Sequence, residues 1–334
     1  MKKILNDPKE FVNESLEGIY AAHADYLEYA AGDPRCLISR QRRARGKVAL
    51  CTAGGSGHLP VFLGYVGEGL LDGCAVGNVF ASPSASQIYE VTKAVNADAG
   101  VLYIYGNYSG DRMNFELASE MAEMDGIKTL HIIAADDVAS AAREDRDRRR
   151  GVAGLFFAYK AAGAAADEGK SLEEVAEITR RTLENTRTLG VALTPCAIPE
   201  VGRPTFQIAD DEMEIGMGIH GEPGIRRGKM MAADEITDLI TAKILEDLPY
   251  KSGDSVAVLI NSLGATPKEE LYIVYRRAAA ILQKADIKID RRYIGEFATS
   301  MEMAGFSVTL LKLDPQIKKY IDAPVFTPFF EQSK

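Results

Sequence analysis

Short apolar runs alternate with longer amphipathic stretches along most of this chain, and this alternation limits the possible folds more than any other feature. In the first half, strands are expected at 48–52, 75–80, 101–105 and 129–134, and helices at 60–71, 84–95 and 114–124. Strands that alternate with helices form a largely parallel sheet covered on both faces, and such sheets bind ligands at the carboxyl ends of their strands. The first half therefore predicts an α/β domain.

Two long helices follow, and the second half of the chain then resumes the alternation. Helices are expected at 152–168, 172–189, 234–248 and 267–285, and strands at 191–194, 205–208, 214–219, 255–261, 287–294 and 307–313. Because 334 residues exceed one ordinary core, we expect two α/β domains, 1–188 and 189–334. Each should have a central mostly parallel or mixed sheet flanked by helices, with the active site in the cleft between them.

Charge and cysteine usage narrow the class of protein. The formal net charge is -9, which disfavours binding to nucleic acid or to anionic membranes. The arginine-rich segment 146–150 is interleaved with Asp147, so we interpret it as a solvated loop and assign it no function. The four cysteines form no C-x-x-C pair and are expected to be buried thiols. No segment has the length of apolar sequence that spans a membrane, so the expected location is the cytoplasm.

The segment 53–58 reads Ala-Gly-Gly-Ser-Gly-His and lies between an expected strand and an expected helix. Backbone groups of Gly55, Ser56 and Gly57 can approach a small polar ligand closely at such a turn. The segment lacks the Gly-Lys-Ser/Thr ending of a P-loop and the spacing of a dinucleotide fingerprint. It therefore indicates a small polar ligand rather than a nucleotide.

A second strand-to-helix turn, 106–115, contains Gly106, Gly110 and the carboxylate of Asp111. A carboxylate at this place suits ligand binding at the end of a parallel strand. It equally suits the N-cap of the following helix, and both interpretations stay open for Asp111.

A third segment, 214–224, places four glycines around His220 at the end of an expected strand. A packed core histidine is the ordinary alternative, but a core position rarely needs glycine on so many sides. His23 and His131 are expected to be structural. No pair of histidines has the spacing of metal ligands, so no metal site is expected.

Four motifs in this order together resemble one known family. They are Gly-Gly-Ser-Gly-His, Asn-Tyr-Ser-Gly-Asp-x-Met-Asn-Phe, Gly-Met-Gly-Ile-His-Gly-Glu-Pro-Gly and the Asn-Ser-Leu-Gly-Ala-Thr-Pro of 261–267. The chain resembles the K subunit of the phosphotransferase-system-dependent dihydroxyacetone kinases, from residue 3 to about residue 328. Four motifs at matching intervals are far more specific than one glycine loop.

The resemblance implies that a ring nitrogen of His220 adds to the ketone of dihydroxyacetone and gives a hemiaminal. Because the ring nitrogen has no second proton to lose, the adduct does not dehydrate to an imine as a lysine adduct would. Glycerol has the same carbon skeleton but no ketone, so it is not captured. The ketose is thereby held with its terminal hydroxyl at one position.

The resemblance also implies roles for other residues. Asp111 is the general base for the attacking hydroxyl, and His58 orients the substrate or shares the proton. The expected catalytic residues are His220, Asp111 and His58. The expected substrate-binding residues are Gly55, Ser56, Gly57, His58, Gly106, Asp111 and His220.

Three positions depart from the usual pattern of that family. Leu59 stands where a glutamate is usual, Gly106 where a lysine is frequent, and Arg112 follows the aspartate. These changes leave a larger ketose such as erythrulose open as the substrate.

The cofactor and partners are expected on other chains. The sequence has no Walker loop, and the resemblance implies a separate L subunit that carries ADP or ATP with Mg²⁺. A phosphotransferase-system M subunit that rephosphorylates the nucleotide and a homodimer of this chain are also implied. The donor, phosphoenolpyruvate through the M subunit or ATP, stays open.

Two rival functions remain. The same family includes dihydroxyacetone-binding paralogues that act as coactivators of a transcription regulator, although the presence of both His58 and Asp111 favours catalysis. The other rival is an unrelated α/β enzyme that uses His220 for acid or base chemistry on a phosphorylated metabolite.

Overall fold

The computed structural model describes residues 2–333, which form two compact units. The first unit contains the chain up to Ala134, Leu155–Arg181, and the chain from Ile317 onward. The second contains Ala135–Gly154 and Thr182–Gln316. The sequence predicts one boundary, between 188 and 189. The structure instead groups 135–154 and 182–188 with the second unit and the chain from Ile317 onward with the first.

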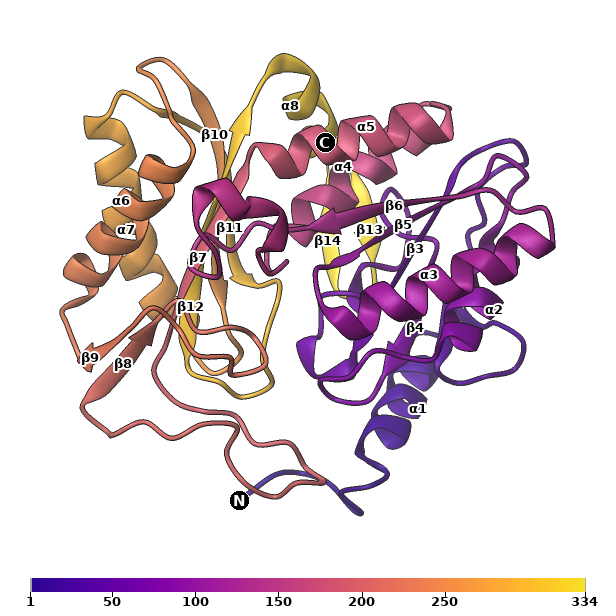
Figure 1. Cartoon of the computed structure of the whole chain (residues 1–334), viewed down its shortest axis with the longest axis horizontal. Helices are drawn as coiled ribbons and strands as arrows, with labels where there is room; N and C mark the ends of the chain where they lie inside the picture. Colours follow the sequence, from indigo (N-terminus) through magenta and orange to yellow (C-terminus); the bar gives the residue numbers. More distant parts are fainter. Residues whose placement is uncertain (1, 334) are drawn as a thin grey trace. The chain divides into compact units, whose positions relative to one another are not determined.

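The first unit is built on a six-stranded sheet in the order β1-β2-β4-β3-β5-β6. Figure 1 labels four of these strands, β3 to β6. Its strands are β1 (Leu27–Tyr29), β2 (Cys36–Ser39), β3 (Ala49–Gly55), β4 (Gly73–Gly77), β5 (Val101–Gly106) and β6 (Thr129–Ala134). The four strands β4, β3, β5 and β6 are parallel, and β1 and β2 join them as antiparallel strands. The expected α/β class is confirmed, with a mixed sheet in this unit.

Helices cover both faces of this sheet. On one face, alternate strand residues such as Cys51 and Tyr103 pack against Ile88 and Val91 of α2 (Ala85–Val95) and against α3 (Ser109–Met124). On the other face lies α4 (Leu155–Asp167), which contacts β3 and β5. Since both faces are covered there, the central strands β3 and β5 consist of continuous buried residues.

The remaining elements that lie wholly or mostly in this unit are shorter or peripheral. They are α1 (Phe11–His23), α5 (Leu172–Glu184), α8 (Pro315–Asp322), and the hairpin of β13 (Val325–Thr327) and β14 (Phe330–Gln332). The capping box expected at the start of α5 is present, because Ser171 and Glu174 exchange hydrogen bonds through their side chains and backbone N–H groups.

The second unit has a six-stranded sheet in the order β11-β10-β12-β7-β8-β9. Its elements are β7 (Thr186–Ala192), β8 (Glu212–Ile215), β9 (Arg226–Lys229), α6 (Ala233–Asp247), β10 (Ser255–Ser262), α7 (Lys268–Lys284), β11 (Lys288–Glu296) and β12 (Gly305–Leu313). Only β10 and β11 pair in parallel, and the other neighbours are antiparallel. Apolar residues of α6 and α7 pack on this sheet to form the core of the unit.

Three local expectations were wrong. Residues 60–71 form no α-helix, because Gly64, Gly67 and Gly69 interrupt the run, which forms only a short 3₁₀ turn at Leu63–Tyr65. Residues 205–208 form no strand. The helix expected at 172–189 ends at Glu184, and strand β7 begins two residues later.

Among residues 2–333, no helix combines the length and the apolar character needed to cross a membrane.

Candidate functional site

Three adjacent strands of the first unit end at the same edge of their sheet. Because β4, β3 and β5 are parallel neighbours, the segments that follow them converge there. These segments are 56–58 after β3, 78–82 after β4, and 107–111 after β5. The structure therefore brings the expected loop of His58 and the expected loop of Asp111 to one edge of one sheet.

The glycine loop packs tightly against the segment that follows β4. A Cβ atom on Gly57 would lie 2.7 Å from the ring of Phe80 and 2.7 Å from the carbonyl oxygen of Val79. The backbone N–H of Gly57 donates to that same carbonyl at 2.8 Å, and the N–H of Ser56 donates to the carbonyl of Asn78 at 3.3 Å. Glycine is thus needed here for close packing, and these two N–H groups already have acceptors within the protein.

His58 is buried and held between two aromatic rings. Its ring is stacked on Phe80, with centroids 4.9 Å apart and planes 23° apart, and Phe62 presents its edge at 6.0 Å. Phe62 has φ +72°, a conformation that is costly for a bulky residue. Strained residues persist where the surrounding structure dictates them, frequently at functional sites. The ring of His58 therefore has a fixed orientation.

Asp111 lies in the first turn of α3, directly after the end of β5, and its residue is only 7% exposed. The helix is capped by Tyr108, without a side-chain hydrogen bond, so the interpretation of Asp111 as the N-cap was wrong. A carboxylate in the first turn is stabilised in its ionised form by the positive end of the helix dipole. Asp111 is thus placed as a buried acceptor at the ligand-binding edge of the sheet.

Two serine hydroxyls at this edge lack a hydrogen-bond partner within the described chain. They are the Oγ atoms of Ser56 and Ser82, and both are buried. Ser82 lies near the start of α3, since a Cβ atom added to Gly110 would be 3.6 Å from the Cβ atom of Ser82. Buried hydroxyls usually find a partner, so a polyhydroxylated ligand suits this edge. The sequence analysis missed Ser82, because the segment after β4 carries no motif.

In the second unit, His220 is paired with Glu222. Its Nδ1 atom lies 2.9 Å from Oε1 of the carboxylate, and its backbone N–H donates to Oε2 at 2.9 Å. Burial alone would raise the pKa of Glu222, but the hydrogen bond from His220 and nearby positive charge outweigh it and lower that pKa to about 2. An ionised carboxylate only accepts hydrogen bonds, so in the neutral form of the ring this contact selects the tautomer with the proton on Nδ1 and the lone pair on Nε2.

The glycines around His220 make room for this pair. Gly221 has φ +86° and Gly216 has φ +80°, which are left-handed conformations that favour glycine. A Cβ on Gly218 would collide with the carboxylate of Glu222 and with the guanidinium of Arg150. The segment therefore uses glycine to bring charged side chains against its own backbone.

The arginine-rich segment was wrongly interpreted as a solvated loop at its C-terminal end. Arg149 is 1% exposed, and its guanidinium donates to Asp247 at 2.9 Å. Arg150 donates to Asp137 at 2.7–2.9 Å and to the carbonyl of Gly216 at 2.8 Å. Both residues are fixed parts of the second unit.

The other histidines and the cysteines were expected to be structural, and their contacts agree with that expectation. Nδ1 of His131 lies 3.0 Å from the hydroxyl of Tyr105, and His23 contacts the ring of Phe329. All four cysteines are buried and unpaired in disulfides, as expected. Within residues 2–333, no cluster of three or more His, Cys, Asp or Glu side chains is arranged to hold a metal ion.

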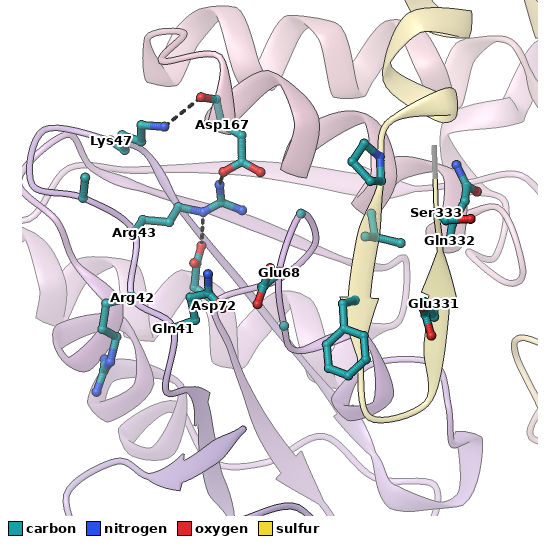
Figure 2. Close-up of a pocket in the computed structure, with 16 residues that line it drawn as sticks. Gln41, Arg42, Arg43, Lys47, Glu68, Asp72, Asp167, Glu331, Gln332 and Ser333 are labelled. Atoms are coloured by element: carbon teal, nitrogen blue, oxygen red, sulfur yellow. Dashed lines mark hydrogen bonds and ion pairs between the residues drawn. The ribbon is translucent and has the colours of Figure 1, made fainter. Parts of the chain in front are cut away.

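A cavity of about 530 Å³ is lined by none of the expected site residues. Figure 2 shows the residues that line it. Several of its charged groups bind one another. Arg43 forms ion pairs with Asp72 and Asp167, and Nζ of Lys47 donates to the backbone carbonyl of Asp167 at 2.7 Å. These contacts hold the first unit together and give no indication of a ligand.

Sequence comparison places most of the chain in one family. The model of the Dak1 domain matches residues 17–329. A PTS-dependent dihydroxyacetone kinase 2, dihydroxyacetone-binding subunit, from Listeria innocua is 42% identical, and the match covers 99% of both chains. An L-erythrulose kinase from Pectobacterium atrosepticum is 40% identical over 99% of this chain, which spans only 56% of that relative.

Structure comparison gives the same result. The dihydroxyacetone kinase of C. freundii is similar with a TM-score of 0.89 and 33% identity, covering 98% of this chain and 59% of that one. A dihydroxyacetone kinase operon co-activator is similar with a TM-score of 0.88 and 31% identity, covering 96% of this chain and 97% of the other. These similarities confirm the expected fold class.

Proposed function

This chain belongs to the Dak1 domain family, whose members include the dihydroxyacetone-binding subunits of dihydroxyacetone kinases, and from that membership we propose that it holds dihydroxyacetone for phosphorylation. It is a subunit of a phosphotransferase with an alcohol group as acceptor. The product is dihydroxyacetone phosphate. We assign the covalent anchor to His220 and the proton acceptor to Asp111.

The pairing of His220 with Glu222 is the observation that carries this proposal. With the proton on Nδ1 and the lone pair on Nε2, Nε2 attacks the ketone carbon, and an N–C bond forms as the C=O π bond breaks. The oxygen takes a proton from water and becomes a hydroxyl. The ring keeps its Nδ1 proton, and the carboxylate of Glu222 balances the positive charge that develops on the ring.

The groups at the edge of the first unit suit the phosphoryl-transfer step. Asp111 accepts the proton of the terminal hydroxyl while the oxygen forms its bond to phosphorus. Such a transition state needs positioning more than strong basicity, because it is largely dissociative. His58, fixed by its stacking on Phe80, and the buried hydroxyls of Ser56 and Ser82 supply hydrogen bonds to the triose. We further propose that Gly55, Gly57 and Gly106 leave space beside it.

We assign the phosphoryl donor to another protein chain. A relative's structure was solved with AMP-PNP and Mg²⁺, and this chain spans only 60% of that relative. We propose that a nucleotide-bearing L subunit with Mg²⁺ supplies the phosphoryl group, that a phosphotransferase-system M subunit recharges it, and that the K subunit is a cytoplasmic homodimer.

Carbon-13 NMR with dihydroxyacetone labelled at the ketone carbon tests the anchor directly. Adduct formation converts a ketone resonance into one of a tetrahedral carbon bound to the protein. The adduct should disappear in His220→Asn. Asp111→Asn should retain it but lose turnover when a nucleotide-bearing subunit is supplied. A protein-bound tetrahedral signal that persists in His220→Asn would show that His220 is not the covalent anchor.

Two alternatives are distinguished by the same assay. L-Erythrulose carries one more hydroxymethyl group, and Gly106 occupies little space, so faster turnover of erythrulose than of dihydroxyacetone would identify that ketose as the substrate. The likeness to an operon co-activator favours a sensor as the second candidate. A stable adduct that is never phosphorylated would assign the chain to that group.

A further inference from the structure

Arg150 is fixed by contacts on both its backbone and its side chain. Its guanidinium bonds to Asp137 through Nε at 2.9 Å and Nη2 at 2.7 Å. Its backbone N–H donates to the hydroxyl of Ser140 at 2.9 Å, and its carbonyl accepts from the N–H of Asp137 at 3.1 Å. Asp137 is itself buried and accepts a hydrogen bond from the backbone of Ala139 at 3.0 Å. The guanidinium therefore has one defined position.

From that position Arg150 contacts the segment that carries His220. Nη2 donates to the carbonyl of Gly216 at 2.8 Å, which ties the start of this segment to Arg150. Nη1 lies against Gly218, at a point that the carboxylate of Glu222 also approaches. The positive guanidinium and the negative carboxylate thus lie close together on the same side of one glycine.

A nearby positive charge favours the ionised form of a carboxylate. Among the causes that lower the pKa of Glu222, the charge of Arg150 comes after the hydrogen bond from His220, the charge of protonated His220 and a hydrogen bond from the backbone of Glu222. While Glu222 is ionised, it accepts the proton of Nδ1 and leaves the lone pair on Nε2. If Glu222 were displaced from His220, nothing in this contact would select that tautomer.

We propose that Arg150, held by Asp137, is a positioning residue that fixes the Gly216–Glu222 segment and keeps Glu222 as the acceptor that selects the reactive tautomer of His220. This inference rests on the proposed function for its consequence in catalysis. The arrangement of charges itself is independent of which ketose binds.

Nitrogen-15 NMR of the histidine rings tests the proposal on the protein without ligand. The chain has only four histidines, and His220→Asn identifies the resonances of His220. At pH 7.5, which lies above the pKa of about 6 to which burial raises Asp137, that carboxylate is mainly ionised. The wild type should show the Nδ1–H form. Arg150→Met should show a mixture of the two tautomers.

The rate of adduct formation is the second readout. Arg150→Met should slow the appearance of the tetrahedral carbon by about tenfold or more, because small misplacements of a reacting group have large effects on rate. Arg150→Lys keeps the charge but not the forked geometry, so it should restore the Nδ1–H form and part of the rate. If Arg150→Met does not fold, the rate of adduct formation in Arg150→Lys tests the proposal in its place.

Arg149→Lys is the matched control. Arg149 is the neighbouring arginine and also bonds a buried carboxylate in the same unit, that of Asp247. Its variant should lower thermal stability and leave the tautomer unchanged. If Arg150→Met and Arg150→Lys both retain the wild-type tautomer, and their adduct rates change by less than about twofold, the role of Arg150 is only structural. If the wild type forms no adduct, the proposed function fails, while the tautomer measurement still decides this inference.

Discussion

The carboxylate of Glu222 receives two hydrogen bonds from His220, one from the ring Nδ1 and one from the backbone N–H, each at 2.9 Å. Because both come from the same residue, the ring cannot rotate without breaking one of them. The carboxylate thus sets both the orientation and the tautomer of the ring, as the aspartate does for the histidine of a catalytic triad.

Glu222→Gln should therefore reduce the rate of adduct formation. The amide keeps the shape of the side chain, but its NH₂ group can face Nδ1 and select the opposite tautomer. We expect a loss of roughly 10²-fold or more in the rate at which labelled dihydroxyacetone becomes tetrahedral. Glu212→Gln, which removes the same charge from β8, is the control and should react like the wild type. Equal rates for both variants would contradict the role of Glu222.

The low pKa of Glu222 predicts how its contribution to stability depends on pH. In the folded protein this pKa is about 2, below the ordinary value of 4.5, so the folded state binds fewer protons than the unfolded state between these values. The stabilising contribution is complete above about pH 5 and is lost as the pH falls toward 2. The difference in free energy of unfolding between wild type and Glu222→Gln should therefore shrink from pH 5 to pH 3, as measured by urea denaturation. A difference that grows over this range would contradict the prediction.

Gly57→Ala should impair phosphoryl transfer by displacing the ring on which His58 is stacked. The added Cβ would lie 2.7 Å from Phe80 and from the carbonyl of Val79, so one of them must move. We expect at least about a tenfold loss of turnover with a supplied nucleotide-bearing subunit, since small misplacements near a reacting group have large effects. Gly18→Ala, in helix α1 with no atom within 4 Å of the new Cβ, is the control and should retain turnover. If both variants turn over equally, the position of Phe80 does not control His58.

Local patterns in the sequence predicted the elements whose environment is uniform along their length. The strands that form β3 and β5 are buried on both faces and appear as continuous apolar runs. The prediction of a helix at 60–71 was wrong. The apolar residues of this run are buried by the surrounding chain rather than along one face of a helix. Phe62, with φ +72°, adopts a conformation that its neighbours in sequence give no reason to expect.

Candidate site residues could be named from the sequence where they lie within one motif, and could not be named where they depend on contacts between distant residues. His58, Asp111 and His220 each stand in a short glycine-containing segment. Arg150 contacts Gly216, which lies 66 positions later in the chain, and such a contact has no local signature. Glu222 lies in the same motif as His220, but its contact with the ring depends on the turn that brings the two side chains together.

Asp136→Ala should destabilise the protein strongly. The buried carboxylate accepts hydrogen bonds from the backbone N–H groups of Val152 at 2.9 Å and Gly154 at 2.8 Å, and from the hydroxyl of Thr188 at 2.5 Å. Removal of the carboxylate leaves buried donors without an acceptor and should lower the free energy of unfolding by about 3 kcal/mol.

Asp210→Ala, at an exposed position, should change the free energy of unfolding by less than about 0.5 kcal/mol. Asp136→Asn retains one acceptor oxygen and should fall between the two. Thermal denaturation followed by circular dichroism measures all three, and an alanine variant as stable as Asp210→Ala would exclude this role of Asp136.

The four cysteines should resist thiol reagents until the protein unfolds. Burial, together with the charge of Asp33 and a hydrogen bond to it, raises the pKa of Cys36 to about 12, and burial also raises the pKa values of Cys51, Cys74 and Cys196. A raised pKa keeps each thiol neutral at pH 8, and the thiolate is the reactive species. Absorbance after addition of an aromatic disulfide reagent should therefore show almost no reaction in native buffer and four thiols in guanidinium chloride.

Cys196 is the thiol to follow, because it lies in the second unit between the hydroxyls of Thr205 and Ser300, near the turn at Gly221. Rapid reaction of the native protein that is abolished by Cys196→Ser would show that this part of the second unit opens to solvent. Rapid reaction that persists in that variant would instead place the opening at the sheet of the first unit.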